Sequence, residues 1–272
     1  MKEIRFTKCQ ATGNDFIILD RITRPLPIAA KKLKDLVRTI CDRKWSVGAD
    51  GVLVLEKSKK ADFRFRIFNP DGTEAQMCGN GSRCVVLYAA RTKIASSPMK
   101  VETRAGILDA SVHGDIVKVR LTDPKDIKWN FCVAVGSCPY MVSFVNTGVP
   151  HVVHFVNDLD KVDVKSVGAD MRYHETFAPK GTNADFVKVV DQHTIRVRTY
   201  ERGVEDETLA CGTGVVASAL IAAESEKLKS PITVITQGGE KLTVHFEKRR
   251  GHFTDVFLEG RAALVFEGTI SY

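Results

Sequence analysis

Apolar and polar residues alternate with a period of two in several segments of the chain. Residues 63–67 and 195–198 alternate apolar residues with arginines, and residues 116–121 and 241–246 follow a similar pattern. This period is typical of strands that bury one face. We therefore expect these four segments to form strands of sheets.

A helical period appears in three other segments. Residues 33–41 place apolar side chains at positions i, i+3, i+4, i+7 and i+8, which predicts an amphipathic helix. Residues 82–90 and 215–223 are apolar on nearly all sides, which predicts helices buried at the centre of a domain. Each of these two apolar segments follows a Cys-Gly-x-Gly motif, which begins at Cys78 in the first case and at Cys211 in the second.

The chain also repeats itself once. Three segments recur in the second half, the first two at an offset of 133 positions: 77–81 at 210–214, 101–106 at 234–239, and 12–17 at 182–187. Three matches in one order make chance a poor explanation, and two related domains that share one fold are the simplest interpretation.

The fold class that we predict is α+β, with two pseudo-symmetric domains. Each domain is expected to be a mostly antiparallel curled sheet or barrel around a central apolar helix. The first domain covers residues 1–122 and regains the strand 262–272, whereas the second covers 123–261. The boundary falls at the turn-like segment 122–126.

Composition narrows the classes of protein that the chain can belong to. The net charge is +7, but the basic residues are scattered, so we expect no nucleic-acid partner and attribute the charge to an anionic substrate and a mildly basic surface. No apolar run approaches the roughly 20 residues that span a membrane. The N-terminus lacks the apolar core of a signal peptide, so we expect a cytoplasmic protein without a membrane partner.

Seven cysteines, an odd number, indicate free thiols in a chain without a secretion signal. Their spacing does not match a zinc or redox motif, so we expect no metal. Five of them are expected to be small buried residues: Cys9, Cys41, Cys84, Cys132 and Cys138.

The two Cys-Gly-x-Gly motifs carry the candidate chemistry. Unpaired N–H groups at a helix start lower the pKa of a thiol there, and the glycines let a carboxylate approach the backbone. If the repeat brings Cys78 and Cys211 to opposite sides of one cleft, one sulfur can remove a proton from a carbon while the other delivers a proton to the opposite face. Inversion of a stereocentre needs this arrangement.

The motifs also resemble a known family. Residues 68–84 closely resemble the first signature of the diaminopimelate epimerases, residues 200–203 with 207–214 resemble the second, and residues 13–16 resemble the N-terminal motif. The resemblance covers nearly the whole chain in order. It implies interconversion of LL- and meso-2,6-diaminopimelate, on the route to lysine and peptidoglycan, without a cofactor and in a homodimer.

The resemblance assigns a role to each matching position. Cys78 and Cys211 would be the two acid/base residues, and His151 and Glu201 would line the site and support catalysis. The carboxylate at the reacting carbon would be held by Gly79, Asn80, Gly212 and Thr213. The rest of the substrate would be bound by Asn14, Asn69, Asn183, Arg202 and Glu201.

Three positions depart from the family pattern at the substrate's distal end. Val149 stands where many members carry Asn, Gly51 stands where many carry Gln, and the loop 203–207 is one residue longer than usual. We therefore expect altered substrate specificity. Phe266 stands where some relatives place a Tyr at the dimer contact.

Other interpretations remain open. A racemase of proline or hydroxyproline on the same fold would leave Arg202 without a carboxylate to bind. A thiol redox sensor would use a Cys78–Cys211 disulfide as its signal, and a basic binding module would associate with nucleic acid in a salt-dependent way. Asn14 and Asn183 would also suit turns, and His151 would suit a satisfied core position.

Overall fold

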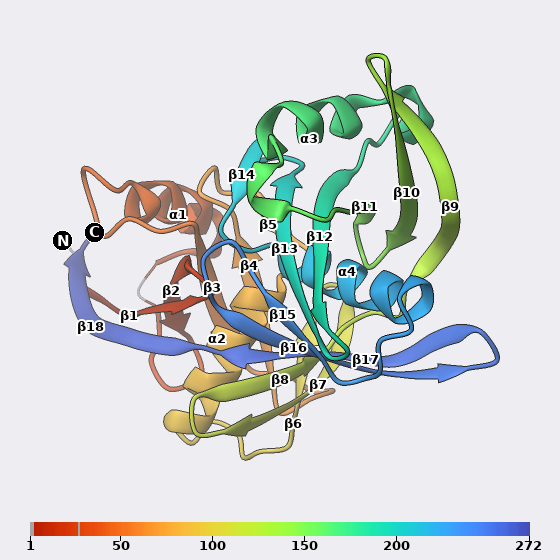
Figure 1. Ribbon diagram of the computed structural model, residues 1–272. Coiled ribbons are helices and arrows are strands. Elements are labelled where there is room, and N and C mark those ends of the chain that lie inside the picture. The colour runs from red at the N-terminus through yellow and green to blue at the C-terminus, as the bar shows by residue number, and fades with distance from the viewer. Residues whose placement is uncertain (1–2, 27) are drawn as a thin grey trace. The chain divides into compact units, whose positions relative to one another are not determined.

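The computed structural model describes residues 3–26 and 28–272, which form two compact units (Figure 1). Unit 1 comprises the chain up to Arg120 together with Gly260–Tyr272, and unit 2 comprises Leu121–Glu259. Both boundaries lie two residues before those expected from the sequence. The sequence placed the boundary in the turn-like segment 122–126. In the structure a strand begins within that segment, at Lys125.

Unit 1 is a curled sheet with two helices. Its strands, in spatial order, are β18 (Ala263–Ser271), β1 (Glu3–Ala11), β2 (Asn14–Asp20), β3 (Gly51–Glu56), β4 (Phe63–Phe68), β6 (Met99–Thr103), β7 (Gly106–His113) and β8 (Ile116–Arg120). The short strand β5 (Glu74–Ala75) forms a hairpin with β4. The pairs β2–β3 and β4–β6 are parallel and the others are antiparallel.

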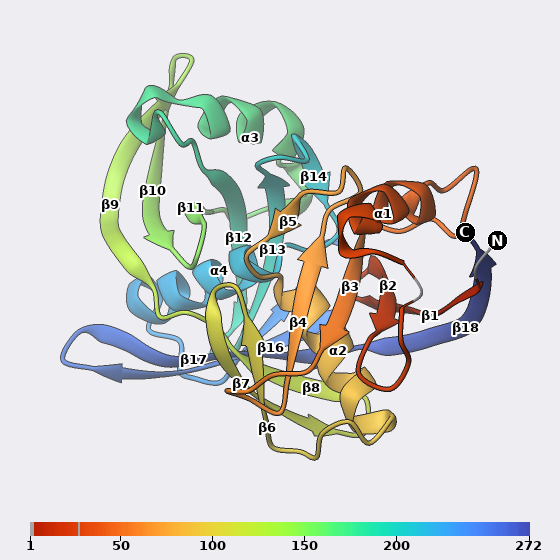
Figure 2. The same cartoon turned by 180° about the vertical axis from the view of Figure 1, so that it is seen from behind.

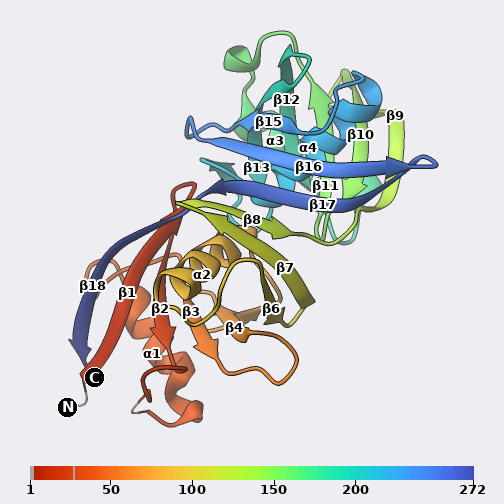
Figure 3. The same ribbon diagram turned by 90° about the horizontal axis from the view of Figure 1, so that it is seen from below.

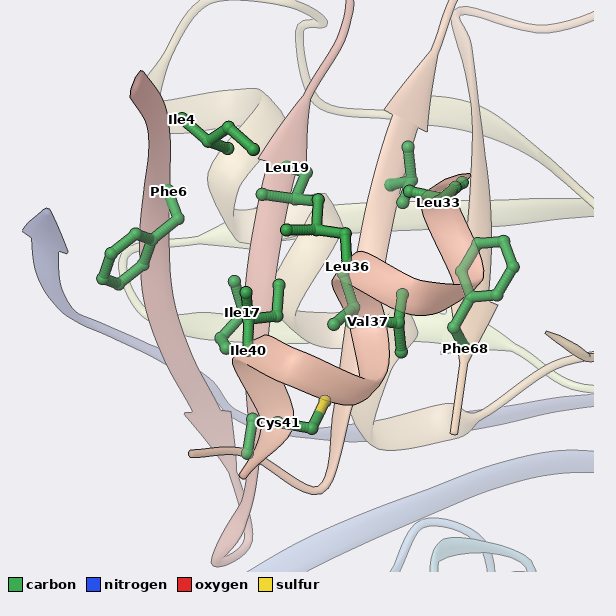
Figure 4. Close-up of a cluster of buried hydrophobic side chains, with 13 residues drawn as sticks. Ile4, Phe6, Ile17, Leu19, Leu33, Leu36, Val37, Ile40, Cys41 and Phe68 are labelled. Carbon is green, nitrogen blue, oxygen red and sulfur yellow. The ribbon is translucent and has the colours of Figure 1, made fainter. Parts of the chain in front are cut away.

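The two helices of unit 1 cover different faces of this sheet. Helix α1 (Leu33–Cys41) places its apolar side on β1, β2 and β3, with Leu36, Val37 and Ile40 among the buried contacts (Figure 4). Helix α2 (Gly79–Arg91) packs on the other face, inside the curl (Figure 3). Since β2 and β3 lie between the helices, both are apolar in an unbroken run, at Phe16–Leu19 and Val52–Leu55.

Unit 2 repeats this plan. Its strands, in spatial order, are β9 (Lys125–Val135), β10 (Cys138–Asn146), β11 (Pro150–Phe155), β12 (Asn183–Asp191), β13 (Thr194–Glu201), β15 (Ile232–Ile235), β16 (Lys241–Arg249) and β17 (His252–Arg261). Strand β14 (Asp206–Thr208) forms a hairpin with β13. The parallel pairs β11–β12 and β13–β15 stand at the positions that β2–β3 and β4–β6 hold in unit 1.

The helices of unit 2 divide the sheet's two faces as in unit 1 (Figure 2). Helix α3 (Val164–Tyr173) contacts β12 and β13 over a cluster that includes Met171, Phe186 and Tyr200. Helix α4 (Gly212–Ser225) contacts β10 to β13 together with β15 and β16, and every residue from Gly214 to Ala223 is buried. The α+β class, the duplication and the central apolar helices predicted from the sequence are confirmed.

One of the three repeat matches was wrong. The match of 12–17 with 182–187 pairs Asp15 with Asp185, but Asp15 lies on β2 and Asp185 lies on β12, which is the counterpart of β3. The register makes this clear, because Phe16 pairs with Gly51 across β2–β3 and His151 pairs with Asn183 across β11–β12. Asn183 therefore corresponds to Gly51. A short match such as Asp-Phe at a strand start is too common to identify equivalent positions.

The five cysteines outside the Cys-Gly-x-Gly motifs divide into two groups. Cys9, Cys41 and Cys84 are buried as expected, but Cys132 and Cys138 are exposed. These two lie on the hairpin of β9 and β10, where much of β9 is open to solvent, so an apolar neighbourhood in the sequence did not mean burial. Within 3–26 and 28–272, no helix combines the length and apolar character that crossing a membrane requires.

Gly168 allows α3 to lie directly on β13. A Cβ atom at this position would come within 2.4 Å of Cβ and 2.9 Å of Cγ of the buried Tyr200. We predict that Gly168→Ala lowers the free energy of unfolding by about 1–3 kcal/mol, because packed interiors yield little to an added methyl group. Urea unfolding measures the change.

Asp170→Ala, on the exposed side of the same helix, is the control and should stay within about 0.5 kcal/mol of the parent. Equal stability of the Gly168→Ala variant and the parent would contradict this packing.

Candidate active site

The first candidate thiol stands at the start of α2. Cys78 is the N-cap residue, with an extended backbone (φ −144°), and the helix begins at Gly79. Its Sγ accepts a hydrogen bond from the backbone N–H of Gly81 at 3.5 Å. A Cβ on Gly81 would come within 3.0 Å of Leu53 on β3, so the glycine also lets the first turn lie close to the sheet.

Polar side chains hold this first turn of α2 in place. The buried Asn80 accepts hydrogen bonds at Oδ1 from the Thr12 hydroxyl at 3.0 Å and from Nη2 of Arg83 at 2.8 Å. Arg83 Nη2 also donates to the Thr12 hydroxyl at 3.0 Å. The Oδ1 atom of Asn80 is therefore used within unit 1.

The other two predicted residues of unit 1 differ in their surroundings. Asn14 begins β2, and its Oδ1 is buried without a hydrogen-bond partner among the described residues. Asn69 is exposed in the turn between β4 and β5, where its Nδ2 donates to the Thr73 hydroxyl at 3.0 Å. The hydrogen bonds recorded for Asn69 do not link it to the Cys78 motif.

The second candidate thiol stands at the start of α4. Cys211 is the N-cap residue, the helix begins at Gly212, and the side chain is buried. Its Sγ lies 3.4 Å from Oγ1 of Thr213. The Thr213 carbonyl also accepts a hydrogen bond from the Thr147 hydroxyl at 3.1 Å, which fixes the turn before β11 to the start of α4.

His151 joins this helix start to the sheet. Its Nε2 lies 2.9 Å from Oγ1 of Thr213, and its Nδ1 lies 2.7 Å from Oδ2 of Asp185. Asp185 Oδ1 in turn accepts a hydrogen bond from the Thr199 hydroxyl at 2.7 Å. The alternation along β11, β12 and β13 puts all three sheet residues on the face that α4 covers.

Glu201, Asn183 and Arg202 lie at the same end of β12 and β13. Glu201 accepts a hydrogen bond from the Thr208 hydroxyl at 3.0 Å. The buried Asn183 donates to the Pro150 carbonyl at 2.8 Å and accepts from the backbone N–H of Arg202 at 2.8 Å. The Arg202 guanidinium donates to the Lys180 carbonyl at 3.0 Å. The predicted residues of unit 2 are therefore brought together.

A comparison with protein families decides where the chain belongs. The model of the family described as diaminopimelate epimerase matches residues 6–127 and 143–265. The diaminopimelate epimerase of Aquifex aeolicus (strain VF5) is 42% identical over 277 residues, which covers 98% of each chain. The chain belongs to the diaminopimelate epimerase family. The resemblance inferred from the motifs is thus confirmed.

Solved structures with lower identity share the fold. A phenazine biosynthesis protein of the PhzF family from Bacillus anthracis matches with a TM-score of 0.76 at 19% identity, over 100% of both chains. A hydroxyproline epimerase from Agrobacterium vitis, solved with bound trans-4-hydroxy-L-proline, matches with a TM-score of 0.71 at 16% identity. That match covers 98% of this chain and 92% of the other. At such identities the likeness establishes the fold alone.

Two departures from the usual sequence of diaminopimelate epimerases now have a structural context. A Cβ at Gly51 would lie 2.7 Å from the carbonyl oxygen of Phe68 on the neighbouring strand, so this backbone has no room for the Gln of many members. Val149 is half-buried, and its carbonyl accepts a hydrogen bond from the backbone N–H of Thr147 at 3.1 Å. Its side chain brings no donor or acceptor to the start of β11.

The pKa values of the two thiols do not follow the expectation that a helix start lowers them. Burial raises the pKa of both cysteines, and the hydrogen bonds from the helix N–H groups offset only part of this effect. The pKa of Cys211 is raised further, because the Glu201 and Asp185 carboxylates disfavour a second negative charge. Burial also raises the pKa of Glu201, with hydrogen bonds from Thr208 and Cys211 acting in the opposite direction.

The sequence analysis missed Asp185 and Thr199. Both are buried polar residues, and their hydrogen bonds determine how His151 is held. A signal for Asp185 was present, because it stands two positions after Asn183 in an otherwise apolar strand and so shares its face. Among residues 3–26 and 28–272, no group of three or more His, Cys, Asp or Glu side chains is placed to hold a metal ion.

We predict that Cys78 ionises at lower pH than Cys211. The reason is that carboxylates act on Cys211, whereas the Arg83 guanidinium, which favours a thiolate, acts on Cys78. Alkylation with iodoacetamide over a pH series, quantified for each cysteine peptide by mass spectrometry, measures the two midpoints. The exposed Cys132 serves as the reference thiol. A lower midpoint for Cys211 than for Cys78 would contradict the assignment.

Proposed function

We propose that the protein interconverts LL- and meso-2,6-diaminopimelate by a cofactor-independent two-base reaction, as a step that supplies lysine and peptidoglycan precursors. The observation that carries this proposal is the duplicated half-site in a chain of the diaminopimelate epimerase family. In each unit a cysteine caps the start of an apolar buried helix and is followed by Gly-x-Gly.

Each half-site supplies groups that the reaction needs. The first turn of a helix has N–H groups without partners inside the helix, and these favour a carboxylate. In the proposed reaction the backbone at Gly79, Asn80, Gly212 and Thr213 holds the α-carboxylate. These N–H groups also stabilise the charge that develops when the α-proton leaves.

The two cysteines exchange one proton each with the substrate. One cysteine, as thiolate, removes the α-proton and becomes a thiol, while the other thiol protonates the opposite face of the carbon and becomes a thiolate. The electrostatics of the two half-sites raise the pKa of both thiols but that of Cys211 more, so Cys78 is the more easily ionised of the two. The reverse reaction uses the same residues with their protons exchanged, so the enzyme returns to its starting state in either direction.

The remaining predicted residues have supporting roles in this proposal. Glu201 and His151 adjust the proton affinity of Cys211, to which Glu201 is coupled directly and His151 through Thr213. Asn14, Asn69, Asn183 and Arg202 bind the substrate. The Arg202 fork suits the distal carboxylate, since a guanidinium binds both oxygens of such a group.

The proposal extends to location and assembly. We place the enzyme in the cytoplasm, where it acts without a membrane or nucleic-acid partner, and we propose a homodimer. Phe266 on β18 supports this assembly, because its ring is 49% exposed although it packs edge-on against Phe6. The neighbouring Val265 is 57% exposed, so two apolar residues of this strand are open to solvent.

Replacement of either cysteine tests the reaction. We predict that Cys78→Ala and Cys211→Ala each lower kcat/KM for LL-diaminopimelate by at least about a thousandfold, because each removes an obligatory acid/base group. Chromatographic measurement of meso-diaminopimelate gives the rates. Cys132→Ser, which alters an exposed thiol, should keep the parent rate.

Two outcomes would contradict the proposal. Retention of more than a tenth of the activity in either alanine variant would exclude the two-thiol mechanism. Faster turnover of proline than of LL-diaminopimelate by the parent would assign the chain to the racemase alternative, and no turnover of either substrate would favour the thiol-sensor alternative.

We also propose relaxed recognition of the distal end of the substrate, because Gly51 and Val149 present no polar side chain there. We predict that Val149→Asn lowers KM for LL-diaminopimelate severalfold with little change in kcat, since an added hydrogen bond to the distal end acts equally in ground and transition states. Val190→Asn, an exposed change on β12, is the matched control. An unchanged KM in Val149→Asn would count against the proposal.

A further inference from the structure

Asp185 is the most deeply buried carboxylate that touches the Cys211 half-site. Its side chain is fully buried, as is that of His151, and the two are joined at 2.7 Å. The second oxygen is held by Thr199 at 2.7 Å. The start of α4 also closes on this carboxylate, because a Cβ at Gly214 would come within 2.5 Å of Asp185 Oδ1.

A carboxylate in this position is costly to the fold. Removing an ionised group from water costs several kcal/mol unless hydrogen bonds compensate for it. Asn has nearly the same shape and would avoid this cost, so what Asp185 adds over Asn is its charge and its inability to donate a hydrogen bond. Both properties act on the ring nitrogen that it contacts.

The inability to donate determines the direction of the neighbouring hydrogen bonds. Because a carboxylate only accepts, Nδ1 of His151 must carry a proton, and in the neutral ring Nε2 is then an acceptor. Nε2 therefore accepts a hydrogen bond from the Thr213 hydroxyl, 2.9 Å away. The lone pairs of Thr213 Oγ1 are left to accept from the Cys211 thiol, whose sulfur lies 3.4 Å away and which also donates to the Glu201 carboxylate.

We propose that Asp185 is a positioning residue that, through His151 and Thr213, holds Cys211 as the proton donor of the resting half-site. This inference rests on the proposed function for its role in catalysis, but the chain of hydrogen bonds lies wholly within unit 2. Asp185 does not touch the reacting carbon in this scheme. It determines whether Cys211 meets the substrate as a thiol or as a thiolate.

Three ionisable side chains face the Cys211 region from the strands beneath α4. Asp185 on β12 and Glu201 on β13 both raise the pKa of Cys211 by their charge. His151 on β11 lowers the pKa of Glu201. Glu201 has no recorded hydrogen bond to His151 or Thr213, but it accepts a hydrogen bond from the Cys211 thiol. A test must therefore separate the charge of Asp185 from its action through Thr213.

The central variant is Asp185→Asn, which keeps the shape and reverses the polarity. With its Nδ2 turned to His151 and its Oδ1 to the Thr199 hydroxyl, the new amide would donate to Nδ1. Nε2 would then carry the proton and donate to Thr213, whose hydroxyl would donate to the sulfur. We expect the alkylation midpoint of Cys211 to fall by about one pH unit or more, whereas that of Cys78 stays unchanged. Asp163→Asn, at the N-cap of α3, is the matched control.

A double-mutant cycle with Thr213→Val separates the two effects. Without the Thr213 hydroxyl the chain of hydrogen bonds is broken, so Asp185→Asn should shift the Cys211 midpoint by less than half as much as in the parent. Glu201→Gln also removes a charge near Cys211 but leaves the chain through His151 intact, so its shift should not become smaller when Thr213 is replaced. Equal shifts from Asp185→Asn in both backgrounds would overturn the positioning role and leave only an effect of charge.

The wild-type protein offers a measurement that needs no variant of Asp185. NMR of protein labelled with ¹⁵N-histidine, with the His151 signals assigned by their loss in His151→Gln, reports which ring nitrogen carries the proton. We expect protonated Nδ1 and unprotonated Nε2 in the neutral ring, and the opposite tautomer would overturn the inference. Neither experiment uses epimerase activity, so failure of this inference is distinguishable from failure of the proposed function.

Discussion

The start of a buried helix leaves backbone N–H groups that the helix itself cannot satisfy, and the candidate site depends on this constraint. In α2 and α4 the helices are buried over nearly their whole length, so their first turns are held inside the sheet. Cysteine at the N-cap and glycine after it leave these N–H groups accessible to an anion. A carboxylate bound there stands beside a sulfur atom, which is the pairing that proton transfer at an α-carbon requires.

Duplication supplies this arrangement twice, but the two copies differ in their surroundings. Cys78 lies in a half-site where Asn80, Arg83 and Thr12 stabilise the helix start and where the charge is positive. Cys211 lies above strands that carry Asp185, His151 and Glu201. Equivalent backbones therefore give two thiols of unequal acidity, as the proposed two-base reaction requires, since one sulfur must be charged in it while the other holds a proton.

Much of this organisation was predictable from the sequence. The strands at 63–68 and 194–201 follow from alternation, and the central helices follow from unbroken apolar segments after Cys-Gly-x-Gly. The hydrogen bonds of Asp185 and Thr199 were not predictable, because they depend on the register between β12 and β13 rather than on spacing along the chain. The thiol pKa values were misjudged, since burial outweighs the helix start and only the fold determines burial.

The origin of the hydrogen at the inverted carbon tests the central claim most directly. LL-diaminopimelate is incubated with the purified protein in deuterium oxide, and product and remaining substrate are analysed by mass spectrometry at low conversion. Two opposed thiols predict one deuterium at the inverted α-carbon of the meso product and none in the recovered LL substrate, because the donor thiol has exchanged with solvent while the acceptor keeps the substrate's proton. Retention of the original proton in the product would contradict the account, since one base would then serve both faces.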